Sequence, residues 1–224
     1  CLALCANNSK PDAENTTYYE IRRSDFRTGG QWDIRGAMAR RDTNVEKILA
    51  AIPAGANRFM QIYYLNKWLA ENNQYNTTVK KDGDGPWYAY ECISALEGLT
   101  GVDGPVCSGY ASALKVLCDK LGIPCITVTG WVSENTKHRW NYIQMEDGKW
   151  YAVDVTNNDR NDNSANLTKW LLVGGKTVIN RKEFLENHPA HNRSYYGGGT
   201  DFTNGPVLSD EAYPRSFTGP AGGS

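Results

Sequence analysis

The sequence predicts an α+β fold in which helices come first along the chain and an antiparallel sheet follows. Between residues 44 and 121, apolar side chains recur at three- and four-residue steps, as they do on one face of a helix. Between residues 126 and 156, three short stretches rich in β-branched and aromatic residues are separated by turn residues, which is typical of strands. We therefore expect at least one helix to pack its apolar face on this sheet.

Length and charge limit the classes of function. The 224 residues are enough for one domain with its own hydrophobic core. Lys plus Arg (24) nearly balance Asp plus Glu (25), and no basic stripe indicates a nucleic-acid partner. No apolar run approaches the roughly 18 residues that a membrane span needs. Neither nucleic-acid binding nor a transmembrane span is expected.

The N-terminal segment differs from the rest. Residues 1–42 are polar and show no sustained hydrophobic period, so we interpret them as an arm or tether before a main domain over 43–224. The chain starts with Cys and has no starting Met, which favours a processed form with Cys1 or Cys5 left from a lipid-attachment site. A cloning boundary is the alternative. We expect an extracellular or cell-envelope location, with lipid anchoring at the N-terminus.

Three helical segments are predicted before the central part of the chain. Asn44 is suited to cap the first, over 45–52. The third, over 87–99, is expected to end near Gly98. The second, over 57–72, has an apolar face made of Phe59, Ile62, Tyr63, Leu65 and Leu69.

The next helix is predicted to begin at Cys107. Gly122 is suited to end it, and Pro124 prevents its continuation. Besides Cys107, its apolar face comprises Tyr110, Ala111, Leu114, Leu117, Cys118 and Leu121.

Cys107 is the candidate nucleophile. At a helix N-terminus, free backbone N–H groups and the helix dipole favour thiolate over thiol. The backbone N–H of Cys107 is also a suitable donor to an oxyanion that forms when the thiolate attacks a carbonyl. The small neighbours Ser108 and Gly109 leave room for a substrate. Cys118 lies on the apolar face, and we interpret it as a core residue.

A nucleophilic cysteine needs a base, and the chain has only three histidines. His188 and His191 lie in a late, polar segment and are predicted to be surface residues. His138 opens a predicted strand with Trp140 and Tyr142 on its own face, so it should be partly shielded from water. His138 is therefore the candidate base.

The turn between the last two predicted strands decides whether Asp154 can orient this histidine. A two-residue loop would place His138 and Asp154 on opposite faces of the sheet. A three-residue loop over 146–148, with Gly148 in the left-handed conformation, pairs Trp140 with Asp154. His138 and Asp154 then become diagonal neighbours on one face, within reach of a hydrogen bond. Glycine at the third loop position favours this second register.

Two segments carry a resemblance to a known family. GPVCSGYASALKVLCDKLGIPC (104–125) and HRWNYIQMEDGKWYAVDVT (138–156) resemble the core of the transglutaminase-like superfamily, in its bacterial branch. The resemblance covers roughly residues 60–185. It implies a papain-like arrangement, in which a catalytic helix packs on an antiparallel β-sheet. The main domain over 43–224 would then be a transglutaminase-like catalytic domain.

The resemblance also implies which residues act. Cys107, His138 and Asp154 occupy the positions of the catalytic triad, in the family's order. The implied chemistry is acyl transfer on amide bonds of peptides or proteins, through a thioester on Cys107. No cofactor and no metal are expected. The expected partner is a peptide or protein substrate, associated with the cell wall.

The type of acyl transfer is left open by the residues. Animal transglutaminases have Trp directly after the nucleophile, where this chain has Ser108, and no acidic cluster here indicates a calcium site. We therefore favour a cell-surface cysteine peptidase or amidase. The alternatives are a protein-glutamine transglutaminase with an amine acceptor, and a non-catalytic binding module that keeps the fold. Gln61, Trp87 and Tyr88 are candidates for the second oxyanion donor.

Cys118 and Cys125 have other interpretations as well. They are separated by a helix end and form no C-x-x-C pair, so a zinc site is a weak alternative. They are expected to be either core thiols or, in an exported protein, a disulfide.

Overall fold

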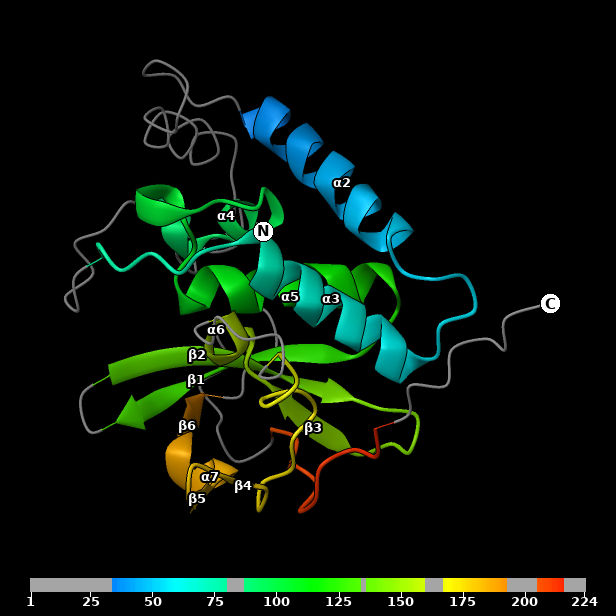
Figure 1. Ribbon diagram of the computed structural model, residues 1–224, viewed down its shortest axis with the longest axis vertical. Helices are drawn as coiled ribbons and strands as arrows, with labels where there is room; N and C mark the ends of the chain where they lie inside the picture. The colour runs from blue at the N-terminus through cyan, green and yellow to red at the C-terminus, as the bar shows by residue number, and fades with distance from the viewer. Residues whose placement is uncertain (1–33, 80–86, 134–135, 160–166, 193–204, 216–224) are drawn as a thin grey trace, which may run out of the picture.

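The computed structural model describes residues 34–79, 87–133, 136–159, 167–192 and 205–215. Helices α2 to α5 lie on one side of an antiparallel sheet, and α7 with the β4–β5 hairpin lies on the other (Figure 1). This arrangement confirms the predicted α+β class. Most of the predicted N-terminal arm, the polar loop after Asp159 and the Gly-rich tail fall outside the described residues.

Helix α2 (Ile34–Ala50) is longer than the predicted first helix, so the C-terminal part of the predicted arm is helical. The predicted cap Asn44 is wrong, since it lies inside this helix. Val45 and Ile48 are buried in the main core, and the Arg40 guanidinium pairs with Glu97 at 2.9 Å. Tertiary packing of this kind stabilises a helix whose polar sequence shows little periodicity.

The next elements follow the prediction closely. Helix α3 (Arg58–Asn72) is capped by Asn57, whose side-chain oxygen accepts from the Met60 backbone N–H at 2.8 Å. The predicted third helix is divided into the 3₁₀ turn η1 (Trp87–Tyr90) and the short helix α4 (Cys92–Leu96). Gly98 ends this segment at φ +67°, and the 3₁₀ turn η2 (Gly101–Asp103) follows.

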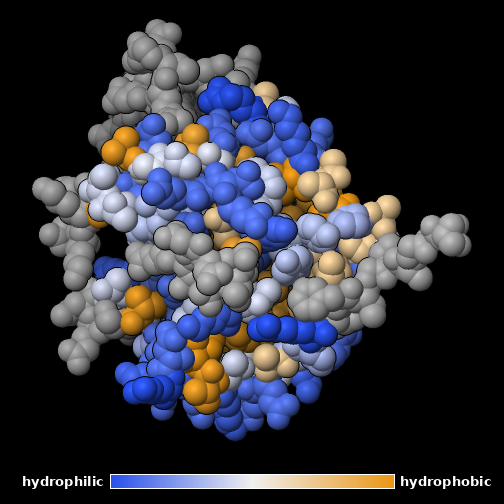
Figure 2. Space-filling model, in the orientation of Figure 1, coloured by the Kyte–Doolittle hydropathy of each residue, from blue (hydrophilic) through white to orange (hydrophobic). Residues whose placement is uncertain are grey.

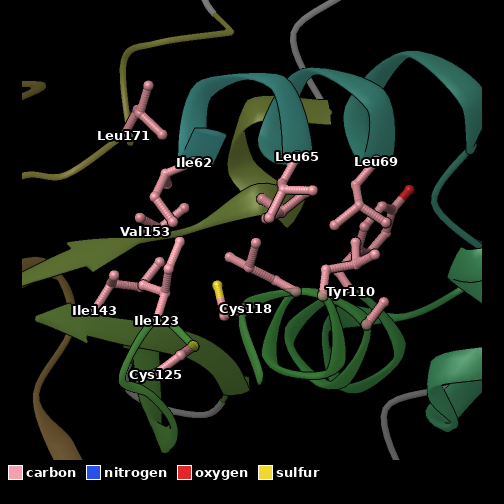
Figure 3. Close-up of a cluster of buried hydrophobic side chains, with 14 of the residues drawn as sticks. Ile62, Leu65, Leu69, Tyr110, Cys118, Ile123, Cys125, Ile143, Val153 and Leu171 are labelled. Atoms are coloured by element: carbon pink, nitrogen blue, oxygen red, sulfur yellow. The ribbon is translucent and has the colours of Figure 1, made fainter. Parts of the chain in front are cut away.

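Helix α5 (Cys107–Lys120) lies between α3 and the sheet. It begins at Cys107 as predicted, and Gly122 follows its end at φ +67°. Figure 3 shows side chains of α3 and α5 meeting above the sheet. The predicted apolar face is confirmed: Tyr110, Ala111, Leu114, Leu117 and Cys118 are buried, and Leu121 is partly buried.

The sheet has four antiparallel strands in the order β3-β2-β1-β6. The three predicted strands are β1 (Cys125–Ser133), β2 (Thr136–Gln144) and β3 (Trp150–Val153). Strand β6 (Ala190–Asn192) was not predicted, and it pairs with β1 at the other edge.

Alternation along the strands gives the sheet two apolar faces and the molecule two cores. The helical layer packs on Cys125, Ile143, Tyr151 and Val153. The opposite face packs with Trp170 and Phe184, through Ile126, Val128, Trp140, Tyr142 and Ala152. A sheet buried on both faces has few polar positions, so those that occur near its edge are candidates for function.

Short elements complete the chain. Helix α6 (Val155–Asp159) follows β3 directly, and the β4 (Val178–Ile179) and β5 (Lys182–Glu183) hairpin leads into α7 (Phe184–Asn187). None of the described helices is long and apolar enough to cross a membrane. The face in Figure 2 is largely hydrophilic, with apolar groups in small scattered patches.

Candidate active site

The hairpin between β2 and β3 has the predicted three-residue loop. Gly148 is at φ +77°, and the Met145 backbone N–H donates to the Lys149 carbonyl at 3.0 Å. Asn141 pairs with Val153, so the register places the next residues, Trp140 and Asp154, opposite each other. The predicted register is confirmed, and side chains at 138 and 154 lie on one face of the sheet.

Strand β3 is shorter than predicted, because Asp154 begins a helix. The prediction that the strand continues to Thr156 is wrong: pairing ends at Val153, and α6 starts at Val155. The Asp154 carboxylate accepts from the Asn157 backbone N–H at 3.0 Å, and its carbonyl accepts from the Asn158 N–H at 3.1 Å. Asp is favoured at such a helix start, and this cap gives the carboxylate a defined position.

His138 and Asp154 form a buried hydrogen-bonded pair. His138 Nε2 lies 2.8 Å from Asp154 Oδ2, and the two residues are 6% and 0% exposed. Burial lowers the pKa of His138, but the Asp154 carboxylate raises it by charge and hydrogen bond, and Cys107 adds to this, so it rises to about 10. Burial raises the pKa of the Asp154 carboxyl, but the charge and hydrogen bond of His138 hold it well below its usual range. The pair therefore favours an imidazolium beside a carboxylate.

Cys107 reaches this pair from the helical layer. The thiol lies close enough to His138 for the charge and hydrogen-bonding capacity of the ring to lower its pKa. Since Nε2 of the ring contacts Asp154, Nδ1 is the nitrogen left for the sulfur. Burial raises the pKa of the Cys107 thiol, but the His138 hydrogen bond and charge, together with the backbone N–H and guanidinium of Arg139, bring it below its ordinary value. Early termination of β3 leaves the β2 edge at Arg139 open to the start of α5. The three predicted site residues thus form one chain of contacts.

The remaining described cysteines are in different environments. Cys92, Cys118 and Cys125 are buried and none forms a disulfide, whereas Cys107 is partly exposed. Burial raises the pKa of Cys118 well above its ordinary value, and a hydrogen bond with Cys125 adds to this. Cys118 and Cys125 are therefore core thiols in this structure, as one of the two interpretations held (Figure 3). A high pKa keeps such a thiol protonated and unreactive.

A second histidine belongs to the site, and the prediction that His188 is a surface residue is wrong. His188 is 1% exposed, and its Nε2 lies 2.9 Å from Asp154 Oδ2. Its ring stacks on Phe184 at 4.5 Å between centroids and contacts Trp140 edge-on at 5.0 Å. The residues around His188 are polar, so the local sequence did not indicate that His188 is buried against Asp154. Phe184, four residues earlier, was the nearby apolar residue that could have indicated a buried helix face. For His191 the structure describes the backbone, in β6, but not the side chain.

The carboxylate of Asp154 accepts several hydrogen bonds. Its Oδ2 accepts from His138, from His188 and from the Asn157 amide at 2.6 Å. The other ring nitrogen of His188, Nδ1, is buried without a hydrogen-bond partner among the described residues. Since an ionised carboxylate only accepts, all three partners donate to it, and each of the two rings carries a proton on Nε2.

The same three side chains could hold a metal by type and proximity. The ligand atoms of His138, Asp154 and His188 lie within 4.8 Å of one another, and imidazole with carboxylate suits Zn²⁺. A bound metal would replace the hydrogen bonds that join both rings to Asp154 and would occupy the base. In this structure both rings are hydrogen-bonded to Asp154, and a metal would compete with these bonds.

The structure describes the side chains of two of the three candidates for the second oxyanion donor, Gln61 and Tyr88. The Tyr88 hydroxyl donates to Asp103 at 2.7 Å, and no hydrogen bond joins Gln61 of α3 to Cys107 in the described part of the chain. The side chain of Trp87 is not described. The start of α5 is nevertheless held in place, because the Val106 N–H donates to the Ala89 carbonyl of η1 at 2.9 Å.

Part of this chain is similar to a known protein family. A family model described as the transglutaminase-like superfamily matches residues 48–155. A crystal structure of a TGase is similar at 13% identity over 64% of this chain and 37% of that chain, with a TM-score of 0.46. A protein from Cytophaga hutchinsonii provisionally described as a cysteine protease is similar at 17% identity over 54% of this chain and 37% of that chain, with a TM-score of 0.38. This chain thus spans little more than a third of the length of either structure. No curated protein is significantly similar in sequence to this chain.

Proposed function

Since residues 48–155 match the family model of the transglutaminase-like superfamily, we propose that this chain is a thiol-dependent enzyme that transfers acyl groups from amide bonds of peptides or proteins. The observation that carries the proposal is the chain of contacts from Cys107 through His138 to Asp154. A partly exposed thiol with a lowered pKa, beside a buried imidazole that a carboxylate holds, is the arrangement that nucleophilic catalysis needs.

The first half of the reaction forms a thioester. The Cys107 thiolate attacks the amide carbonyl carbon, and the carbonyl electrons move to oxygen. The backbone N–H of Cys107 is suited to stabilise that oxyanion. As the C–N bond breaks, the amine takes the Nδ1 proton of His138 and leaves. The acyl group is then bound to sulfur and His138 is neutral.

The second half releases the acyl group. His138 takes a proton from a water molecule, the hydroxide attacks the thioester carbonyl, and the C–S bond breaks to give a carboxylic acid and the thiolate. Asp154 keeps the ring in one orientation through both halves and stabilises its charged form. With an amine in place of water, the same steps form a new amide. We propose hydrolysis, as in a cysteine peptidase or amidase, because Ser108 stands where animal transglutaminases have Trp.

Mass spectrometry of a peptide library tests the proposal. The library is incubated with and without a primary amine, using the wild type and the Cys107→Ala, His138→Ala and Asp154→Asn variants. We expect products that gain one water, and a loss of at least about 10³-fold in each variant. Cys118→Ala removes a buried thiol instead and should keep activity. Circular dichroism checks that each variant is folded.

The outcomes separate the candidate functions. Products that carry the amine in preference to water would indicate the protein-glutamine transglutaminase alternative. Turnover by His138→Ala at the wild-type rate would contradict the mechanism. A folded wild type that modifies no peptide and forms no acyl adduct on Cys107 would favour a non-catalytic binding module.

A further inference from the structure

Arg139 lies beside the candidate nucleophile. It follows His138 on β2, and because side chains alternate it points to the other face, toward the start of α5. Its Nη1 donates to the hydroxyl of Ser108 at 2.6 Å, and its Nε donates to the Thr129 hydroxyl at 3.3 Å. Ser108 is the residue next to Cys107, so the guanidinium is held within electrostatic range of the thiol.

Among the described residues, no acidic side chain forms an ion pair with Arg139. Its two acceptors, Ser108 and Thr129, are neutral hydroxyls. A guanidinium has five N–H donors, so two hydrogen bonds leave most of them available. The residue is only partly buried.

The position is also an unusual one for a cation. The N-terminal end of a helix such as α5 carries partial positive charge, which disfavours Arg beside it. The imidazole of His138 is positively charged when the thiol is ionised, and Asp154, on the same face of the sheet as His138, compensates this charge. Beside the positive end of α5, the Arg139 guanidinium therefore forms no ion pair with a carboxylate of the described residues, although this position favours an anion.

We infer that Arg139 is a recognition site for a carboxylate of the substrate, located close to the carbonyl that Cys107 attacks. This inference rests on the proposed function and names its substrate class: peptides with an acidic side chain or a free α-carboxylate near the reacting amide. A guanidinium binds a carboxylate through two parallel N–H bonds, which Lys cannot reproduce. The Ser108 and Thr129 hydroxyls hold the guanidinium in one orientation, which lowers the entropy cost of binding.

Alkylation of Cys107 tests this site without a known substrate. Iodoacetate and iodoacetamide have nearly the same size, but only iodoacetate carries a carboxylate. We expect the rate constant for iodoacetate divided by that for iodoacetamide, both measured at Cys107, to be about five- to tenfold lower in Arg139→Met than in the wild type. The reason is that this variant loses a charged hydrogen bond to the reagent carboxylate. Arg139→Lys should give an intermediate ratio. Lys137→Met removes one exposed positive charge from the same strand and should leave the ratio unchanged.

The ratio separates recognition from a general charge effect. If Arg139 only stabilises the thiolate, Arg139→Met slows both reagents equally, and an unchanged ratio would overturn the inference. An equal fall of the ratio in Lys137→Met would also overturn it, since net charge would then explain the result.

Matched peptides test the substrate class itself. Glu- and Gln-containing peptides are compared at each position around the reacting amide, as the ratio of their kcat/KM values. We expect the wild type to prefer Glu at one position and Arg139→Met to lose that preference while still processing the Gln peptide. Equal turnover of both peptides by the wild type would refute the substrate class and leave the proposed acyl transfer intact. Failure of acyl transfer is recognised separately, by the absence of products that depend on Cys107.

Discussion

Asp154 is the residue on which the geometry of the candidate site depends most. It is fully buried, and its two carboxylate oxygens accept from side chains of His138, His188 and Asn157 and from one backbone N–H. A buried charge is tolerated when hydrogen bonds of this kind replace its hydration. The same bonds fix the direction in which Asp154 presents its lone pairs to His138.

Selective alkylation should identify the nucleophile. We expect iodoacetamide at pH 6 to modify Cys107 before any other described cysteine, because its pKa is lowered whereas that of Cys118 is raised. Peptide mapping by mass spectrometry measures the order of labelling. Faster labelling of Cys92 or Cys118 would mean that the nucleophile is assigned wrongly.

His188 should act as a positioning residue. His188→Phe keeps an aromatic ring on Phe184 but removes the donor to Asp154, so we expect kcat to fall about tenfold with little change in KM. His188→Gln can still donate and should keep most of the activity. Without this donor, the Asp154 carboxylate interacts more strongly with the His138 imidazolium, so the pKa of His138 should rise further. The alkaline limb of the pH profile for Cys107 alkylation, where His138 loses its proton, should therefore move to higher pH in His188→Phe. A limb that stays in place would indicate that the ring only fills space.

Among the elements, helix α5 is positioned by a close approach at Gly109. A Cβ atom there would lie 2.7 Å from the Ala89 carbonyl oxygen, 2.8 Å from the Ser94 hydroxyl and 2.9 Å from the Pro105 Cβ. These distances are shorter than van der Waals contact, so only glycine allows α5 to pack this tightly on η1 and α4. The position of Cys107, two residues earlier, follows from that packing.

Gly109→Ala should therefore destabilise the protein and displace the nucleophile. We expect a loss of about 1–3 kcal/mol in the free energy of unfolding, measured by urea denaturation, and slower alkylation of Cys107. Ser112→Ala, on the same helix, should change stability by less than about 0.5 kcal/mol. An unchanged stability of Gly109→Ala would show that α5 has room to move.

At the scale of the whole molecule, the candidate site lies where the two layers meet. Helix α5 and helix α7 lie on opposite sides of the sheet (Figure 1). His138 and Asp154 belong to the sheet face of Trp140 and Ala152, whereas Cys107 begins α5. They meet because β3 ends at Val153 and leaves the edge of β2 accessible to α5. The ionised groups of the site thus lie between the two cores. Because their pKa values differ between the folded and unfolded protein, the free energy of unfolding depends on pH.

Stability should fall at alkaline pH in a characteristic window. The pKa of His138 is raised to about 10 in the folded protein. Its contribution to the free energy of unfolding is therefore complete below the unfolded pKa of about 6.5 and is lost as pH rises toward 10. The lowered pKa of Cys107 acts in the opposite sense, with a contribution that grows until pH reaches the ordinary thiol value of about 8.5. The two effects offset each other between about pH 6.5 and 8.5. We expect a net loss on the order of 1–2 kcal/mol between about pH 8.5 and 10.

Urea denaturation at pH 7, 8, 9 and 10 measures this dependence. Asp154→Asn removes the carboxylate that raises the pKa of His138, so its unfolding free energy should decline less above pH 8.5 than that of the wild type. Lysines and tyrosines titrate equally in both proteins, and the difference between the two curves isolates the site. Parallel curves would contradict an ionised His138–Asp154 pair.

Local pattern in the sequence was sufficient for the α+β class, for α3 and α5, and for the register of the β2–β3 hairpin. Each of these depends on neighbours within a few residues: a periodic apolar face, a cap such as Asn57, or a glycine at φ +77° in Gly148. The hydrogen bond between His138 and Asp154 was predictable for the same reason, since the turn determines which residues share a face.

Only the tertiary structure decided the rest. The packing of α2 depends on burial of Val45 and Ile48 against distant segments, and the end of β3 depends on Asp154 capping α6. The role of His188 depends on contacts with residues more than thirty positions away in the chain, which its polar neighbours do not indicate. Such contacts form when separate elements pack together. They produce no periodic pattern in the local sequence, so they could not be predicted from it.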